Sequence, residues 1–177
     1  MIVRNPDQRV AILVDVQNLY YSARHLYQSR VNFKNLLRLL VSRRLLVRAI
    51  GYVVKDPKQK HNEFFDALNA AGFEIKEKEL QVFYGGVKKG NWDVGMAMDA
   101  VRLGHKVDSV IIVSGDGDFL PVVNYLQQSL GCLVEVAAFK QTSNHQLIEM
   151  ADDFVDIGSF TKDLLFKTKY SVASSGY

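Results

Sequence analysis

Short runs of apolar, largely β-branched residues recur along the chain, and between them apolar residues repeat every three or four positions. The clearest runs lie at residues 9–15, 47–54, 110–113 and 133–139. Runs of this length predict buried strands, whereas the three-to-four-residue spacing predicts amphipathic helices. Because strands and helices alternate along the chain, we predict an α/β protein. The expected architecture is a three-layer α/β/α sandwich around a mainly parallel sheet of about five to six strands.

Polar residues before the apolar stretches, and glycines after them, locate the helices. Asn18, Asp93 and Asp118 are placed to cap three of them. Pro121 falls in a first helical turn, where its missing N–H group costs nothing. The expected helices cover about residues 19–27, 33–40, 58–71, 93–103, 121–130 and 142–150, and weaker strands are expected at 73–78, 80–84 and 154–157, with a flexible basic loop at 85–92.

Composition places the chain among compact globular proteins. It has 177 residues, 48% of them hydrophobic, and three prolines, which suits one domain with a sizeable core. We expect a single domain over residues 1–177, with a core at about 8–158 and a helical tail at 159–177. No signal-peptide pattern and no apolar run of membrane-spanning length are found, so we expect a cytoplasmic protein without membrane association. Cys132 is the only cysteine, which excludes an intrachain disulfide and a cysteine-rich zinc site.

Charge is divided unevenly along the chain. Residues 1–90 hold 16 Lys and Arg against 8 Asp and Glu, a net +8, whereas residues 91–177 hold 6 against 11, a net −5. A basic half beside an acidic half is the arrangement expected where a phosphate-binding surface adjoins a metal-binding pocket.

Acidic side chains stand where several predicted elements begin or end. Asp15 ends the first strand, Asp116 and Asp118 follow the strand at 110–113, and Asp93 opens a helix. In open parallel sheets the functional crevice lies outside the carboxyl ends of the strands. Four carboxylates gathered there could not all stay ionised without a cation, and oxygen-only ligands favour Mg²⁺ or Mn²⁺ over zinc.

Several of these residues also have a structural interpretation, which the sequence leaves open. Asp116 could close an Asx turn, and Asp118 and Asn18 could serve only as helix caps. Asp99 falls inside a helix that is apolar almost all round, so its carboxylate needs either a cation or a partner such as Arg102.

A cation held by carboxylates and flanked by basic residues suits hydrolysis of a phosphodiester, because the ion activates water and stabilises the leaving oxygen. No Ser-His-Asp or Cys-His arrangement competes with this interpretation. The candidate contacts to such a phosphodiester substrate are Lys55, Lys58, Lys60, Lys88, Lys89 and Ser114.

Three motifs occur in order along the chain: ILVDVQNL at 12–19, KGNWDV and the residues after it at 89–99, and VSGDGDF at 113–119. Two shorter segments, 143–147 and 151–154, follow them. Together they resemble the signatures of the NYN domain, in its LabA-like branch, within the PIN-like nuclease superfamily. The resemblance covers roughly residues 8–158.

This resemblance implies a sheet of order 3-2-1-4-5 and a Mg²⁺-dependent ribonuclease centre. It carries over Asp15, Asn18, Asp93, Asp116 and Asp118 as the catalytic set. The four aspartates of that set are the expected metal ligands, with Asp99 as a further candidate. The partner it implies is RNA, in single-stranded form, and a homodimer is compatible with the sequence.

Two other functions were weighed against the ribonuclease. A haloacid-dehalogenase-like phosphatase also carries an aspartate on its first strand, but it needs a second acid two residues later, where this chain has Gln17. A non-catalytic RNA-binding or regulatory module with the same basic surface stays open, because a complete acidic set permits catalysis without establishing it.

Overall fold

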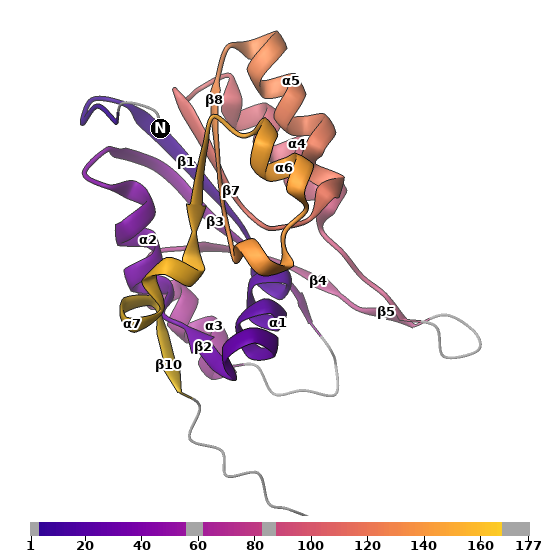
Figure 1. The fold of residues 1–177 in the computed structure, drawn as a ribbon. Coiled ribbons are helices and arrows are strands. Elements are labelled where there is room, and N and C mark those ends of the chain that lie inside the picture. The colour runs from indigo at the N-terminus through magenta and orange to yellow at the C-terminus, as the bar shows by residue number, and fades with distance from the viewer. Residues whose placement is uncertain (1–3, 56–61, 83–87, 168–177) are drawn as a thin grey trace, which may run out of the picture.

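The structure is a computed structural model that describes residues 4–55, 62–82 and 88–167 (Figure 1). Within these residues the main sheet has six strands in the order β4-β3-β1-β7-β8-β9, and all neighbours are parallel. Counted along the chain within this sheet, the order is 3-2-1-4-5-6. The predicted α/β sandwich and its order 3-2-1-4-5 are therefore confirmed, with a sixth strand added at one edge. The strands are β1 (Arg9–Asp15), β3 (Leu45–Lys55), β4 (Glu74–Glu79), β7 (Ser109–Val113), β8 (Leu133–Ala138) and β9 (Asp153–Asp156).

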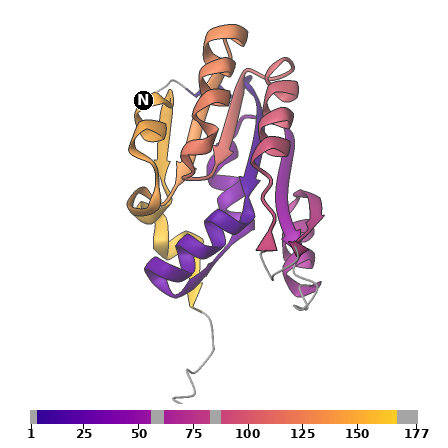
Figure 2. The same cartoon turned by 90° about the vertical axis from the view of Figure 1, so that its right-hand side faces the viewer.

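Helices pack on both faces of this sheet (Figure 1 and, turned by 90°, Figure 2). One face is covered by α1, α2, α3 and α7, and the other by α4, α5 and α6. Short connections between them include the 3₁₀ turns η1, η2 and η3. The bounds are α1 (Val16–Tyr27), α2 (Phe33–Val41), α3 (Asn62–Ala71), α4 (Asp93–Gly104), α5 (Leu120–Leu130), α6 (His145–Met150), α7 (Thr161–Leu164), η1 (Gly117–Phe119), η2 (Lys140–Thr142) and η3 (Ile157–Phe160).

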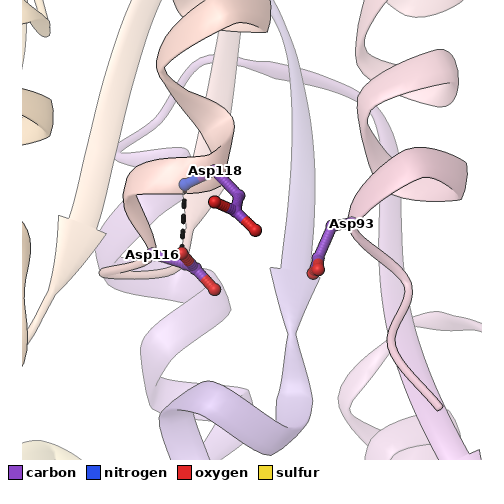
Figure 3. A group of neighbouring side chains, drawn as sticks. All are labelled: Asp93, Asp116 and Asp118. Carbon is purple, nitrogen blue, oxygen red and sulfur yellow. Dashed lines mark hydrogen bonds between the residues drawn. The ribbon is translucent and has the colours of Figure 1, made fainter. Parts of the chain in front are cut away.

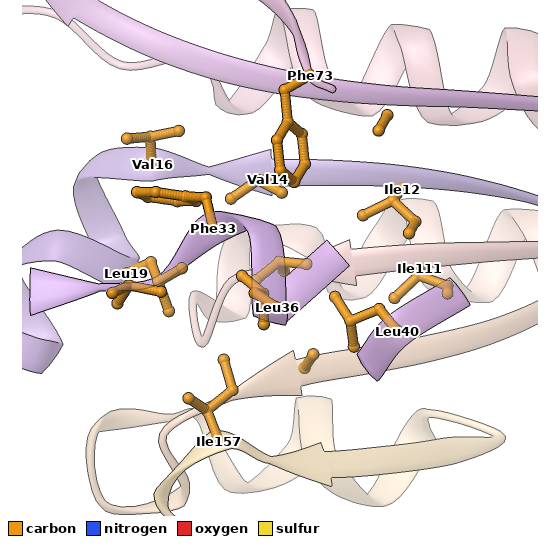
Figure 4. Close-up of a cluster of buried hydrophobic side chains, with 14 of the residues drawn as sticks. Ile12, Val14, Val16, Leu19, Phe33, Leu36, Leu40, Phe73, Ile111 and Ile157 are labelled. Atoms are coloured by element: carbon orange, nitrogen blue, oxygen red, sulfur yellow. The ribbon is translucent and has the colours of Figure 1, made fainter. Parts of the chain in front are cut away.

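The sheet separates two hydrophobic cores. Along β1, Val10, Ile12 and Val14 face the α1–α2 side, whereas Ala11 and Leu13 face the α4–α5 side, and all five are fully buried. This alternation explains why the strand is an unbroken apolar run, since both of its faces are covered. The first core, shown in Figure 4, gathers side chains from β1, α1, α2, β7, η3 and the turn before β4: Ile12, Val14, Val16, Leu19, Phe33, Leu36, Leu40, Phe73, Ile111 and Ile157.

Helix α1 begins three residues earlier than predicted, and the three residues expected as helix caps hold other positions. Helix α1 begins at Val16 and is capped by Asp15, which accepts a hydrogen bond from the backbone N of Asn18, so Asn18 lies inside the first turn. Asp93 is the first residue of α4 rather than its cap. Asp118 lies in η1, ahead of α5, and Asp116 closes the Asx turn before it.

The ends of the chain also depart from the prediction. The expected helical tail at 159–177 holds η3 and α7, but residues 165–167 form a strand, β10 (Leu165–Lys167), that pairs antiparallel with the unpredicted β2 (Ser29–Val31). Residues 168–177 lie outside the described residues, as do residues 58–61 of the expected third helix.

Part of the predicted basic loop has regular structure. Within it, β6 (Lys88–Lys89) pairs antiparallel with β5 (Gln81–Val82), and residues 83–87 lie outside the described part. Among the described residues, no helix is long and apolar enough to cross a membrane.

Candidate metal centre

Three aspartates from two separate parts of the chain converge at the carboxyl edge of the sheet (Figure 3). Asp116 and Asp118 come from the loop after β7, and Asp93 comes from the first turn of α4. Each offers one carboxylate oxygen such that all three oxygens lie within 4.8 Å of one another. These side chains were expected to meet because their elements begin or end at the same edge of the sheet, and in the structure they do meet there.

Asp15, the fourth expected ligand, lines the same pocket, which has a cavity volume of about 320 Å³. Its carboxylate accepts hydrogen bonds from the backbone N of Asn18 at 3.0 Å and from the Ser114 hydroxyl at 3.5 Å. The pKa of Asp15 is raised to about 6, first by burial and in addition by the nearby charges of Asp93 and Asp116, against the opposing effect of these hydrogen bonds. The pocket is lined by Asp15, Gln17, Asn18, Tyr21, Tyr52, Asn91, Trp92, Asp93, Asp116 and Asp118.

A chain of hydrogen bonds fixes the loop that carries Asp116. The side-chain oxygen of Asn18 accepts from the backbone N of Gly115 at 3.1 Å, and the hydroxyl of Ser114 accepts from the backbone N of Asp116 at 3.2 Å. One oxygen of Asp116 then accepts from the backbone N of Asp118 at 3.0 Å. Asn18 therefore holds the acidic loop in position from α1. This role differs from the helix cap and from the catalytic role that were considered for it from sequence.

The two glycines of this loop are required by close packing. A Cβ atom on Gly115 would lie 2.6 Å from the Oγ atom and 3.0 Å from the Cα atom of Ser143, and one on Gly117 would lie 2.5 Å from Nδ2 of Asn144. Asn144 also caps α6 and donates its backbone N–H to the carbonyl of Gly115. The segment at 143–147 thus acts as a support for the acidic loop.

Asp93 is positioned by its neighbour Trp92. The indole Nε1 donates to the carbonyl of Val53 at 2.9 Å, the Trp92 ring lies 5.4 Å from that of Tyr52, and a Cβ on Gly95 would lie 2.7 Å from the indole. The first residue of α4 is therefore anchored against β3. Burial raises the pKa of Asp93, and the charges of Asp116 and Asp118 add to this, whereas the hydrogen bond from Asn91 opposes it.

The donor set fits a hard divalent cation such as Mg²⁺ or Mn²⁺. Among the described residues, no Lys or Arg lines the pocket, and no ion pair neutralises Asp93, Asp116 or Asp118. The raised pKa of Asp93 is due first to burial and in part to this uncompensated repulsion. Every acidic or amide side chain in the lining offers oxygen, and the described lining contains no His or Cys, which is the ligand chemistry of Mg²⁺ or Mn²⁺ rather than of zinc.

Asp99 lies outside this cluster of carboxylates. It is 6% exposed, accepts a hydrogen bond from the hydroxyl of Tyr52 at 2.7 Å, and forms ion pairs with Lys76 and Arg102. Burial acts to raise the pKa of Asp99, but the hydrogen bonds from Lys76 and Tyr52 outweigh it and the net shift is downward. Its charge is already compensated, so the structure gives Asp99 a structural role and does not bring it to the metal centre.

The structure describes only part of the set of residues expected to contact RNA. Lys55 pairs with Glu77 and lies over the ring of Phe65, whereas Lys58 and Lys60 fall outside the described residues. Ser114 is 1% exposed, so it supports the carboxylates and has no surface for the RNA contact expected of it. For Lys88 and Lys89 the structure describes the backbone of β6 alone.

Several residues of the pocket were not singled out as site residues from sequence. Gln17 was considered only as the position where a phosphatase would need an acid, Tyr21 was assigned only to the first helix, and Asn91 and Trp92 were placed in the basic loop. The spacing of Gln17 and Tyr21, four apart and directly after the Asp15 strand, is a signal that could have placed both on the side of the helix facing the acids. Lys78 was also missed: its Nζ lies 3.4 Å from the carbonyl oxygen of Asn91 and 6.0 Å from the centre of the Trp92 ring.

A parallel three-layer α/β fold with a cluster of carboxylates at the carboxyl edge of its sheet defines the class of this protein, and comparison with known proteins narrows that class to a family. A sequence model of the NYN domain matches residues 9–158, so the chain belongs to the NYN domain family. It is 28% identical over 131 residues to the low amplitude and bright protein LabA of Synechococcus elongatus, covering 67% of this chain and 68% of that protein. A crystal structure of a protein of unknown function from Vibrio parahaemolyticus matches with a TM-score of 0.83 and 34% identity, covering 93% of this chain and 100% of the other. The LabA-like resemblance inferred from the motifs is confirmed.

Proposed function

We propose that this protein is a ribonuclease that uses Mg²⁺ or Mn²⁺ to hydrolyse phosphodiester bonds in RNA. The observation that carries the proposal is the convergence of Asp93, Asp116 and Asp118, whose oxygens lie within 4.8 Å of one another and have no cationic partner among the described residues. Membership of the NYN domain family, which resembles the PIN-like nucleases, supports RNA as the substrate.

The residues of the chain divide the work between them. Asp93, Asp116 and Asp118 would hold the ion, with Asp15 completing the set, and Asn18 holds the Asp116 loop in place through Gly115. When bound, a divalent cation would activate water and stabilise the charge that develops on the leaving oxygen. Contacts from Lys55, Lys58, Lys60, Lys88 and Lys89 to the RNA backbone are part of this proposal, and they would make affinity fall steeply with added salt.

The test compares RNA cleavage by Asp118→Asn with cleavage by the wild type, each with and without added Mg²⁺ or Mn²⁺. Asp66→Asn, which neutralises an exposed carboxylate on α3 away from the pocket, is the matched control. We expect metal-dependent cleavage by the wild type and by Asp66→Asn, and a loss of about 100-fold or more in Asp118→Asn. Products should carry 5′-phosphate and 3′-hydroxyl ends, because activated water and not the 2′-hydroxyl is the proposed nucleophile.

A protein that binds RNA without cutting it in either metal would have the non-catalytic binding or regulatory role instead. Cleavage that persists undiminished in Asp118→Asn would place the chemistry elsewhere. A phosphatase of the haloacid-dehalogenase type has no support in the pocket, because Gln17 lines it where that chemistry requires an acid.

A further inference from the structure

The side of the acidic pocket formed by α1 carries an amide and an aromatic side chain in addition to the carboxylates. Gln17 and Tyr21 both line the pocket and are four residues apart, so they lie on the same face of the helix. Tyr21 is 63% exposed, although an aromatic side chain of this size usually covers its ring. Nothing in the metal centre uses either side chain.

The ring of Tyr21 is in contact with the ring of its neighbour in the sequence. Tyr20 lies against it with ring centres 5.5 Å apart and ring planes at 72°, and the hydroxyl of Tyr20 accepts a hydrogen bond from Arg24 at 3.0 Å. Tyr21 is 63% exposed despite this contact, so most of its side chain stays open to solvent. The helix itself is fixed at its start by the Asp15 cap and by the bond from Gly115 to Asn18. Tyr21 is therefore an exposed ring on a helix whose first turn is fixed by these hydrogen bonds.

The electrostatics of the pocket restrict what could bind beside the metal centre. The described lining contains carboxylates, amides and aromatic rings but no Lys or Arg, so it offers no positive charge to a phosphate. A nucleic acid strand that enters here can gain affinity from its bases, which stack on aromatic rings whatever their sequence. Its phosphates are left to the proposed ion and to cations beyond the lining, such as Lys78 beside Asn91 and Trp92. Amide side chains such as that of Gln17 can donate to and accept from the edge of a base.

We propose that Tyr21 and Gln17 form a subsite for an unpaired nucleobase next to the acidic centre, with the base stacked on Tyr21 and its edge within reach of the Gln17 amide. This inference rests on the proposed ribonuclease function and names its substrate class. Bases in a duplex have their faces and edges occupied, whereas those of a single strand can be turned out onto an aromatic side chain. The subsite thus selects single-stranded RNA over duplex RNA.

The test is a binding cycle between the side chain and the base. A labelled single-stranded RNA is titrated with protein in EDTA by fluorescence anisotropy, and the strand is then replaced by versions with one abasic residue at successive positions. Tyr21→Leu should weaken binding of the intact strand about tenfold, and Tyr21→Phe should restore most of this loss because it keeps the ring. At one abasic position the effect of Tyr21→Leu should disappear, since the contact is already absent.

Two controls separate stacking from damage to the fold. Tyr125→Leu removes a 42% exposed tyrosine on α5 that does not line the pocket, and it should bind every strand as the wild type does. Tyr21→Leu should also unfold at the wild-type temperature. In the presence of Mg²⁺ it should raise KM about tenfold with little change in kcat, the pattern of a contact made equally in the ground and transition states.

The outcomes distinguish this inference from the proposed function. If Tyr21→Leu binds all strands like the wild type, or loses the same factor on every abasic strand, the subsite is wrong, even where cleavage depends on Asp118. If the cycle shows coupling at one position but no RNA is cut, the subsite stands and the ribonuclease proposal fails. If no RNA is bound at all, both fail.

Discussion

Asp15 sits at the end of β1 with its carboxylate under two opposing influences. Hydrogen bonds from Asn18 and Ser114 favour the ionised form, but burial and the charges of Asp93 and Asp116 disfavour it more strongly and raise its pKa to about 6. A carboxyl group whose pKa is higher in the folded than in the unfolded state destabilises the fold once pH exceeds both values. The metal-free protein therefore carries a cost at neutral pH that it lacks in acid.

Replacing this carboxyl tests the sign of that cost. Asp15→Asn keeps an oxygen that can cap α1, so it should raise the free energy of unfolding of the EDTA-treated protein by about 1–3 kcal/mol at about pH 7.5. The gain should shrink as pH falls through about 6 and vanish below about pH 3, where the wild-type carboxyl is protonated in both states. Urea unfolding across this range measures it. An equal loss of stability at every pH would mean that Asp15 is needed as a structural cap alone.

Gly115 is a position at which a single methyl group should matter. Its added Cβ would press on the backbone of Ser143, which cannot move as a flexible side chain can, so Gly115→Ala should destabilise the protein by about 1–3 kcal/mol. It should also weaken Mn²⁺ binding by shifting Asp116. The matched control is Gly51→Ala, whose Cβ would make an ordinary contact at 3.5 Å with Val16 and should be close to neutral. Calorimetric titration and thermal unfolding measure both effects, and a neutral Gly115→Ala would contradict the packing account.

Helix α4 reaches the site through the residue that precedes it. Trp92 is bonded to the carbonyl of Val53 and packed on Tyr52, whereas Asp99, farther along the helix, is tied to Tyr52 and Lys76. The start of α4 is thus fixed to β3, and its middle to β3 and β4. This double attachment sets the distance between Asp93 and the loop after β7.

Trp92→Phe should separate positioning from stability. The variant keeps an aromatic ring on Tyr52 but loses the bond to Val53, so we expect Mn²⁺ affinity to fall about tenfold with a loss of stability of about 1 kcal/mol. Tyr52→Phe is the complementary variant: it keeps the seat for Trp92 and removes the bond to Asp99, so it should lose stability with little change in metal affinity. Calorimetry on both reads the two quantities. Equal metal affinity in Trp92→Phe and the wild type would show that Asp93 does not depend on this anchor.

The central strands could be predicted because both faces of the sheet are covered there, which makes each of them a largely apolar run, whereas the strand order came from the family resemblance. The start of α1 was less predictable, because Asp15 and Asn18 both have side chains that can cap a helix. Tertiary contacts decide which of the two does so. Asn18 is drawn into α1 by its bond to Gly115, across 97 residues of sequence. The β2–β10 pair was missed because three-residue strands have too few residues to show an alternation.

A buried charge network joins parts of the chain far from the metal centre. Glu135 on β8 is fully buried and accepts hydrogen bonds from Arg44, from Arg4 at 3.1 Å and from the hydroxyl of Ser109 at 2.8 Å. Arg44 also donates to the carbonyls of Leu40 and Val41 at the end of α2. The network connects α2, β7, β8 and the segment before β1 where the sheet strands begin.

Breaking one side of this network should be costly. Glu135→Leu would leave Arg44 buried without its counter-ion and should reduce the free energy of unfolding by about 3–5 kcal/mol. Adding Arg44→Met should recover much of that loss, because an apolar pair avoids the desolvation of both charges. Denaturant unfolding of the two single variants and the double variant forms the cycle. Additive losses would mean that the two side chains act independently.

The acidic centre could be assembled from sequence because its ligands stand at element ends, whereas its surroundings depend on packing between distant segments. Asp93, Asp116 and Asp118 were identified from their places at element ends. For Asp99 the sequence offered Arg102 as a partner, which the structure confirms, but not Lys76, which lies on β4. The aromatic wall of Tyr21 and Trp92 became visible only with the pocket. Lysine contacts could not be placed from charge counts, since Lys55 is paired with Glu77 and Lys78 lies by Trp92.

The account rests on carboxylates that hold the ion on which cleavage depends, and the metal dependence of the rate tests this most directly. The initial rate of cleavage of a single-stranded RNA is measured against Mn²⁺ concentration for the wild type, Asp93→Asn and the control Asp66→Asn. We predict that Asp93→Asn shifts the midpoint to at least about tenfold higher Mn²⁺, because one charged ligand is lost, while Asp66→Asn leaves it unchanged. A midpoint that is the same in all three proteins, or cleavage that needs no metal, would contradict the account.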